Sequence, residues 1–154
     1  MRFFFYGTLL DGGYNAVAAW LHGRMELIGP ASVAGVLEAV PDPEGWYPAL
    51  LEGDGQVHGR LYETAADFGA EDLARLDAYE DYDPLQSESS LYLRQTLTVK
   101  LASSGTGNGT GSGDSTCQAQ AYRFNRPLPA GARAIPHGDF VRWLAEEGLA
   151  PFGG

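Results

Sequence analysis

The chain has 154 residues, 44% of them hydrophobic, and a formal net charge of -10. This length suits one domain, residues 1–154, with a buried core. The charge argues against nucleic-acid binding, since Lys100 is the only lysine and the arginines are scattered. No stretch approaches the ~18 consecutive apolar residues of a membrane span. The lone cysteine, Cys117, rules out an internal disulfide and suits a reducing compartment. We therefore expect a cytoplasmic protein.

The N-terminus begins with an aromatic run, Phe3 to Tyr6, that breaks at Gly7. This pattern predicts a buried strand followed by a tight turn, whose backbone N–H groups can be presented to a ligand. The same pattern also fits a purely structural turn. Asn15 is positioned to cap a short helix over residues 16–21.

Strands are expected wherever apolar residues alternate or cluster between turn residues. Turns are predicted at residues 29–30, 41–45 and 53–55. Gly35 inside a strand indicates a bend, a bulge or a close backbone approach, and Pro48 favours an edge strand or a bulge. The predicted strands are residues 25–28, 32–40, 46–51, 56–63, 92–101 and 118–124.

Two further helices are predicted. Residues 70–80 carry Leu73, Leu76 and Tyr79 at helical spacing, and the helix must end before Pro84. A last helix begins with Asp139 as its cap and ends at Gly148.

Residues 103–116 are almost wholly Gly, Ser, Thr, Asn and Asp. Such a stretch cannot bury enough apolar surface to become ordered, so we expect a flexible hairpin loop between two strands. Many short strands and a few helices without regular strand–helix alternation predict an α+β fold. A small mixed sheet closing toward a β-barrel with flanking helices fits best.

Several kinds of chemistry find no support in the sequence. His22, His58 and His137 lie far apart without metal-ligand spacing, and Cys117 follows the flexible loop, a poor place for an activated thiolate. The sequence contains no G-x-S-x-G, G-x-G-x-x-G or Walker pattern. We therefore expect no metal, no nucleotide and no other cofactor.

A carboxyl group remains as the candidate for proton transfer. Helical periodicity places both Asp77 and Glu80 within about 40° of Leu73 on the helix surface. A carboxyl group facing a pocket would have a raised pKa, whereas one reaching solvent would not. The spacing alone does not choose between the two acids.

Several short motifs occur along the chain. The first, Phe5-Tyr6-Gly7-Thr8-Leu9, is similar to the Tyr-Gly-Ser/Thr-Leu signature of the γ-glutamylcyclotransferase-like (AIG2-like) family. The others follow in the family's order: Tyr47-Pro48-Ala49, Val57 to Tyr62, Leu76 to Glu80, Tyr92-Leu93-Arg94, Ala121-Tyr122 and Gly138-Asp139-Phe140.

The resemblance implies a fold, a reaction and a set of site residues. The fold is a small mixed β-barrel with flanking helices. The reaction is a cyclising acyl transfer, of transferase or lyase type, that releases 5-oxoproline and an amine from a γ-glutamyl amino acid or γ-glutamylamine. By resemblance, Tyr6, Gly7, Thr8, Leu9 and, less directly, Tyr122 bind the substrate. Glu80, rather than Asp77, acts as general base and acid.

Two departures from the family concern specificity. The Gly/Ser-rich stretch is not a family hallmark, and Leu10-Asp11 stands where some relatives have a basic residue. These departures leave the leaving group open. The sequence also leaves the oligomeric state and the pathway open. Besides the enzyme, two alternatives stand: a non-catalytic module that binds a small ligand on the same scaffold, and a protein-interaction domain.

Overall fold

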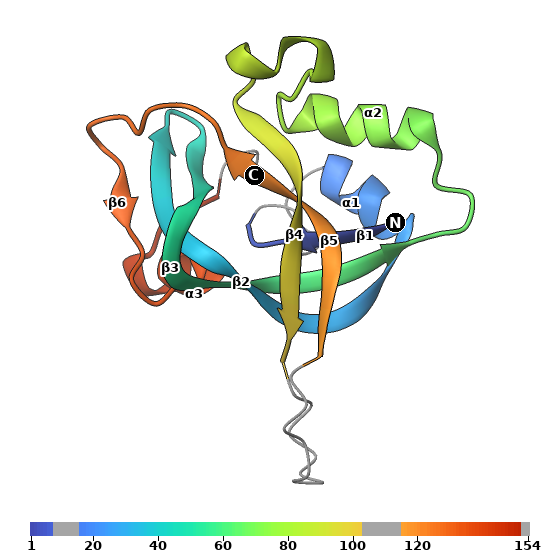
Figure 1. Cartoon of the computed structure of the whole chain (residues 1–154). Coiled ribbons are helices and arrows are strands. Elements are labelled where there is room, and N and C mark those ends of the chain that lie inside the picture. The colour runs from blue at the N-terminus through green and yellow to red at the C-terminus, as the bar shows by residue number, and fades with distance from the viewer. Residues whose placement is uncertain (8–15, 103–114, 152–154) are drawn as a thin grey trace, which may run out of the picture.

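A computed structural model describes residues 1–7, 16–102 and 115–151 (Figure 1). Its two longest elements are β2 (Met25–Asp42) and β3 (Gly45–Thr64), which form one extended hairpin. The remaining elements are β1 (Arg2–Phe5), α1 (Ala16–His22), α2 (Ala70–Tyr79), the 3₁₀ helix η1 (Pro84–Ser89), β4 (Tyr92–Leu101), β5 (Thr116–Phe124), β6 (Arg133–Ala134) and α3 (Phe140–Glu147).

Five strands close into a mixed β-barrel, as the sequence predicted. The order is β3-β1-β5-β4-β2, and the pairing of β2 with β3 completes the ring. β1 runs parallel to β5, whereas every other pair in the ring is antiparallel. β6 adds a short antiparallel strand to β2. Figure 1 shows α1 and α2 on one side of the barrel and α3 on the other.

Two of the predicted turns are wrong, because the strands continue through them. Residues 29–30 lie within β2, and residues 53–55 lie within β3. The two strands accommodate the glycines through shifts in the register of their pairing. On β2, one shift lies between Leu27 and Gly29 and the other between Ala34 and Val36. The second shift confirms the predicted irregularity at Gly35. The predicted turn at 41–45 is the tip of the hairpin, where Asp42 pairs with Gly45.

The other boundaries lie close to the prediction. α3 is capped by the Asp139 side chain and followed by Gly148 in the left-handed conformation. β5 begins at Thr116, two residues before the predicted start, and pairs with β4 as an antiparallel hairpin. The connecting residues 103–114, where the flexible loop was predicted, lie outside the described residues.

The alternation of β1 divides the core into two clusters. Phe4 and Tyr6 join a cluster that takes residues from all five barrel strands and from α3. Phe3 and Phe5 join a second cluster with Leu21 of α1 and Leu76 of α2. β1 thus links the barrel to the helices that cover it, and its C-terminal end leads directly to the cavity described next.

Candidate active site

Gly7, just beyond the end of β1, lies against Pro48 of β3. A Cβ atom at position 7 would lie 2.2 Å from Pro48 Cγ, so no larger residue fits without moving the chain. Tyr6 is 5% exposed, and its hydroxyl group donates a hydrogen bond to the backbone carbonyl of Tyr122. The start of the turn is therefore fixed on two sides, by β3 and by β5.

The other half of the site comes from the C-terminal end of α2. Burial of Leu76 holds the helix on the barrel, and the Glu80 N–H donates to the Leu76 carbonyl at 3.1 Å. Asp81 then takes a left-handed conformation, with φ of 52°, which ends the helix. Glu80 is therefore the C-cap residue of α2, and it is only partly exposed.

The structure separates the two acids that periodicity left equivalent. Asp77 is 5% exposed and forms an ion pair with Arg94, at 2.9 Å from Nε to Oδ1. Asp77 Oδ1 also accepts a hydrogen bond of 2.6 Å from the Tyr122 hydroxyl group. Asp77 is therefore engaged by two donors, whereas Glu80 lines an open cavity.

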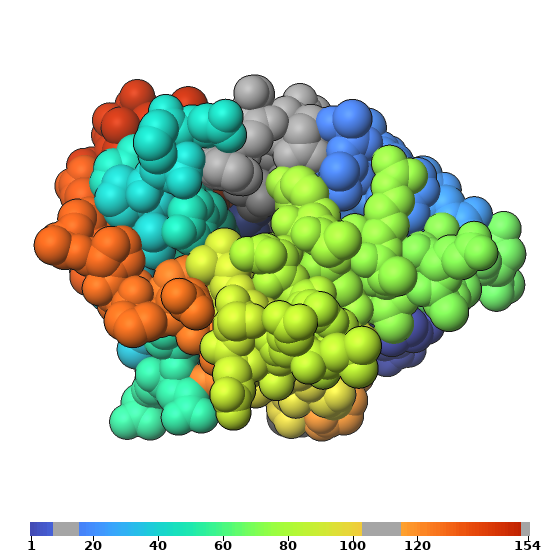
Figure 2. Space-filling model, turned by 90° about the horizontal axis from the view of Figure 1, so that it is seen from above, coloured from blue at the N-terminus to red at the C-terminus, as the bar shows by residue number. Residues whose placement is uncertain are grey.

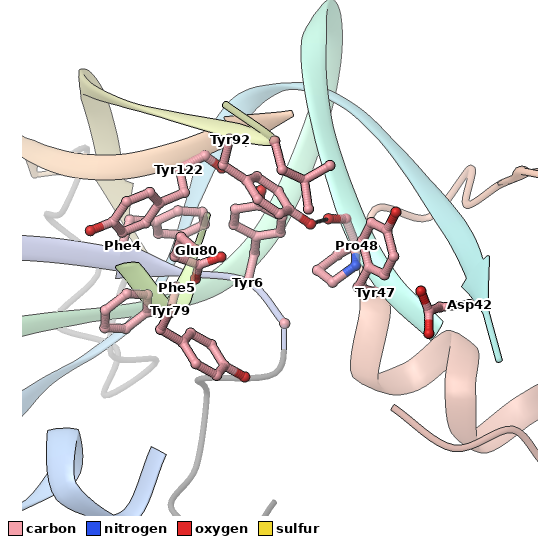
Figure 3. Close-up of a pocket in the computed structure, with 12 residues that line it drawn as sticks. Phe4, Phe5, Tyr6, Asp42, Tyr47, Pro48, Tyr79, Glu80, Tyr92 and Tyr122 are labelled. Carbon is pink, nitrogen blue, oxygen red and sulfur yellow. Dashed lines mark hydrogen bonds between the residues drawn. The ribbon is translucent and has the colours of Figure 1, made fainter. Parts of the chain in front are cut away.

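The cavity has a volume of about 140 Å³ and lies between β1, β3, β5 and the end of α2. Four residues predicted for the site line it together: Tyr6, Gly7, Glu80 and Tyr122. Figure 3 shows Glu80 at one end of the cavity and Asp42 at the other. Thr8 and Leu9, also predicted to bind substrate, lie outside the described residues.

Burial and charge both act on the Glu80 carboxyl group. Loss of hydration raises its pKa, and the negative charge of Asp77 raises it further, to about 8. At pH 7 the group is therefore mostly protonated. A carboxyl group in this range can both give and accept a proton near neutral pH.

Three buried tyrosines of the cavity wall stay neutral. Burial raises the pKa of Tyr6, Tyr92 and Tyr122 above the ordinary value. Each hydroxyl group donates within the protein: Tyr6 to the Tyr122 carbonyl, Tyr92 to the Pro48 carbonyl and Tyr122 to Asp77. These contacts hold the wall in place around Glu80.

Sequence reasoning missed three contributors to the site. Pro48 was interpreted as an edge-strand or bulge residue and quoted in a motif, but it was given no role at the site, although it sets the space at Gly7. Arg94 was quoted in a motif but given no role. Asp42 was assigned to a turn, and nothing in its local pattern indicates that the hairpin tip reaches the cavity. In the view from above, α2 and η1 cover the middle of the molecule, and the tip of the β2–β3 hairpin lies beside them (Figure 2).

Two further findings concern metal binding and membrane spans. Within residues 1–7, 16–102 and 115–151, no three or more His, Cys, Asp or Glu side chains gather in a way that could hold a metal ion. In the same ranges, no helix has both the length and the apolar character needed to cross a membrane.

Comparison with known proteins identifies the fold and the family model that this chain fits. Residues 3–142 match the model of the family described as gamma-glutamyl cyclotransferase, AIG2-like. No curated protein matched.

Solved structures show the same fold. The Escherichia coli protein ytfP is 26% identical, covers 96% of this chain and 99% of its own, and superposes with a TM-score of 0.54. An AIG2-like protein from mouse is 24% identical, with coverage of 90% and 92% and a TM-score of 0.55. A gamma-glutamyl cyclotransferase is 12% identical, with coverage of 98% and 88% and a TM-score of 0.59.

Proposed function

The chain belongs to the AIG2-like gamma-glutamyl cyclotransferase family, and on this premise we propose that it is an active γ-glutamyl cyclotransferase. The substrate is a γ-glutamyl amino acid or a γ-glutamylamine, and the products are 5-oxoproline and a free amine. One observation carries the proposal: the Glu80 carboxyl group, whose pKa is raised by burial, lines the same cavity as Tyr6 and Gly7, which follow directly after β1.

The reaction needs one new bond and one broken bond. The α-amine of the γ-glutamyl group attacks the γ-carbonyl carbon and forms a C–N bond, which closes a five-membered ring. The C–N bond to the leaving amine then breaks. The attacking nitrogen must lose a proton and the leaving nitrogen must gain one, so a single group can carry the proton between them.

We assign this proton transfer to Glu80. Its ionised form accepts a proton from the attacking amine, and the resulting acid donates it to the leaving nitrogen. Burial and the charge of Asp77 raise the pKa of Glu80 to about 8, so the carboxyl group can both take up and release a proton near neutral pH, as a shuttle that acts in both directions must.

The end of β1 is proposed to hold the substrate. Backbone N–H groups of the turn formed by Tyr6, Gly7, Thr8 and Leu9 bind the glutamyl carboxylate or the developing oxyanion. The close approach of Gly7 to Pro48 keeps the described part of this turn in one position. Because the attack is intramolecular, holding the glutamyl chain in a curled pose supplies much of the rate enhancement. Tyr122 is proposed to contribute the ring that forms the wall beside Glu80.

The test is a panel of γ-glutamyl amino acids and γ-glutamylamines, with 5-oxoproline identified by mass spectrometry. We expect release from at least one compound and, for Glu80→Gln, a loss of at least about 10²-fold in kcat, the lower end of general acid–base contributions. Glu71→Gln, a neutralised carboxylate on the exposed first turn of the same helix, is the matched control and should retain full activity. Saturable binding without product would instead support a non-catalytic ligand-binding module.

A further inference from the structure

Arg94 of β4 holds the Asp77 carboxylate from behind the wall of the cavity. Its guanidinium group reaches both carboxylate oxygens, from Nε to Oδ1 at 2.9 Å and from Nη2 to Oδ2 at 3.4 Å. In this forked geometry an arginine fixes both the position and the orientation of a carboxylate. The Asp77 side chain is 7% exposed and the Arg94 side chain 20%, so the ion pair is largely shielded from water. Neither side chain lines the Glu80 cavity.

The remaining contacts of Arg94 fix the guanidinium group itself. Its Nη1 donates to Gln120 Oε1 at 3.2 Å, and the group lies over the ring of Tyr82, 5.8 Å from the ring centroid. The Tyr82 backbone N–H donates to the Asp77 carbonyl at 2.9 Å and so closes the end of α2. Arg94 therefore contacts residues on both sides of Glu80 in the sequence.

Tyr122 connects this ion pair to the other half of the site. It lies directly opposite Arg94 in the pairing of β4 with β5. Its hydroxyl group donates to Asp77 Oδ1 at 2.6 Å, and its backbone carbonyl accepts the hydrogen bond from the Tyr6 hydroxyl group. One chain of contacts thus runs from the residue before the turn, through Asp77, to Arg94. A displacement of Asp77 would change the distance between Glu80 and this turn.

Asp77 also supplies the charge that acts on Glu80. The titratable groups that line the cavity with Glu80 are Tyr6 of β1, Asp42 of β2, Tyr47 of β3, Tyr79 of α2, Tyr92 of β4 and Tyr122 of β5. Asp77 itself lines a surface hollow together with Asp81, Tyr82 and Asp83. Burial and the negative charge of Asp77 raise the pKa of Glu80 to about 8. Loss of the Arg94 cation would leave that negative charge uncompensated, so its effect on Glu80 would increase.

We propose that Arg94 is a positioning residue for the cyclisation, which acts through Asp77 by fixing the place of Glu80 and the charge beside it. The proposal rests on the role assigned to Glu80 under the proposed function. Because Arg94 does not line the cavity, its loss should lower kcat rather than raise KM. The turn that is proposed to bind the glutamyl group keeps its own contact, that of Gly7 with Pro48.

The first readout needs no substrate. The titration midpoint of the Glu80 side-chain carboxyl carbon is measured by ¹³C NMR in wild type, Arg94→Gln, Arg94→Lys and Arg24→Gln. Arg94→Gln should raise the midpoint by at least about 0.5 pH unit, because the Tyr122 hydroxyl group still favours the ionised form of Asp77. Arg94→Lys keeps the positive charge and should leave the midpoint near that of wild type.

Arg24→Gln is the matched control. It breaks an ion pair of 2.8 Å, from Nη2 to Oδ2 of Asp72, at the first turn of the same helix. The variant therefore loosens the far end of α2 without touching the contacts of Asp77. It should leave both the Glu80 midpoint and kcat unchanged.

The second readout is the rate of 5-oxoproline formation. Arg94→Gln should lower kcat at least about tenfold and change KM by less than about twofold, and Arg94→Lys should recover part of the loss. The paired variant Asp77→Asn/Arg94→Gln leaves no buried carboxylate uncompensated, so it should fold even where Arg94→Gln does not. Its Glu80 midpoint should lie below that of wild type. In the Asp77→Asn background, Arg94→Gln should cost much less than tenfold in kcat, since its route of action is already removed.

The proposal is overturned if Arg94→Gln leaves the Glu80 midpoint at or below that of wild type, or if Arg24→Gln moves it equally. It is also overturned if the paired variant raises the midpoint, or if Arg94→Gln lowers kcat as strongly in the Asp77→Asn background as in wild type. A wild-type protein that forms no 5-oxoproline refutes the proposed function instead, and the NMR midpoints then decide alone whether Arg94 acts on Glu80 through Asp77.

Discussion

Replacing Glu80 by glutamine should make the folded protein more stable at alkaline pH. In the folded state, burial and the charge of Asp77 raise the pKa of Glu80 from 4.5 to about 8. An unfolded chain keeps the ordinary value. Between these two pH values the folded state holds a proton that the unfolded state has released, so the stability of the wild-type protein falls as pH rises from about 4.5 to about 8. Glutamine does not titrate, and the variant escapes this loss.

The size of the effect follows from the two pKa values. Each unit of difference corresponds to about 1.4 kcal/mol. Between pH 5 and pH 9, titration of Glu80 alone costs the wild-type protein about 4 kcal/mol of unfolding free energy. Water reaches the partly exposed carboxyl group from the cavity, so we expect a measured difference of about 2–4 kcal/mol.

The assay is urea denaturation of wild type, Glu80→Gln and Glu71→Gln at several values between pH 5 and pH 9. The advantage of Glu80→Gln over wild type should grow with pH and level off above pH 8, and Glu71→Gln serves as the control for removal of a carboxylate from the exposed start of the same helix. A Glu80→Gln difference that does not change with pH would refute the raised pKa and, with it, the proposed environment of the carboxyl group.

Two further predictions concern the surroundings of Glu80. Asp77→Asn removes the negative charge that helps to raise the pKa of Glu80, so the acid limb of the kcat/KM profile should move to lower pH, and a profile unchanged from wild type would contradict this coupling. Gly7→Ala places a methyl group against Pro48 and should reduce kcat/KM at least about tenfold, because a small displacement misplaces the substrate. Gly69→Ala, where the added methyl group meets only an ordinary contact at 3.9 Å, is its control in the same assay and should keep full activity.

Local patterns predicted most of the elements, and the failures share one cause. The β4 boundaries, the α3 cap and the end of α2 depend on residues close in sequence, so periodicity and capping reveal them. The turns expected at residues 29–30 and 53–55 failed because pairing between long strands accommodates glycines as register shifts. Such pairing is a property of two distant segments, and neither segment alone indicates it.

The candidate site shows the same division. Gly7 stands out in the sequence because a strand end has a local signal, whereas Glu80 was selected over Asp77 only by the resemblance to the family. Periodicity left Asp77 equal to Glu80, since the partner that distinguishes them, Arg94, lies on β4. Likewise, the space that makes glycine necessary at position 7 is set by Pro48, a residue 41 positions away. Tertiary contacts therefore decide which carboxyl group faces the cavity.

The most direct test of the central claim is the formation of 5-oxoproline by wild-type protein and by Glu80→Gln, with Glu71→Gln as control. The account predicts product from the wild type and the control, and almost none from a Glu80→Gln variant whose circular dichroism and unfolding transition remain those of a folded protein. Equal product formation by the Glu80→Gln variant would contradict the role assigned to this carboxyl group. The absence of product from every compound and every variant would contradict the proposed activity itself.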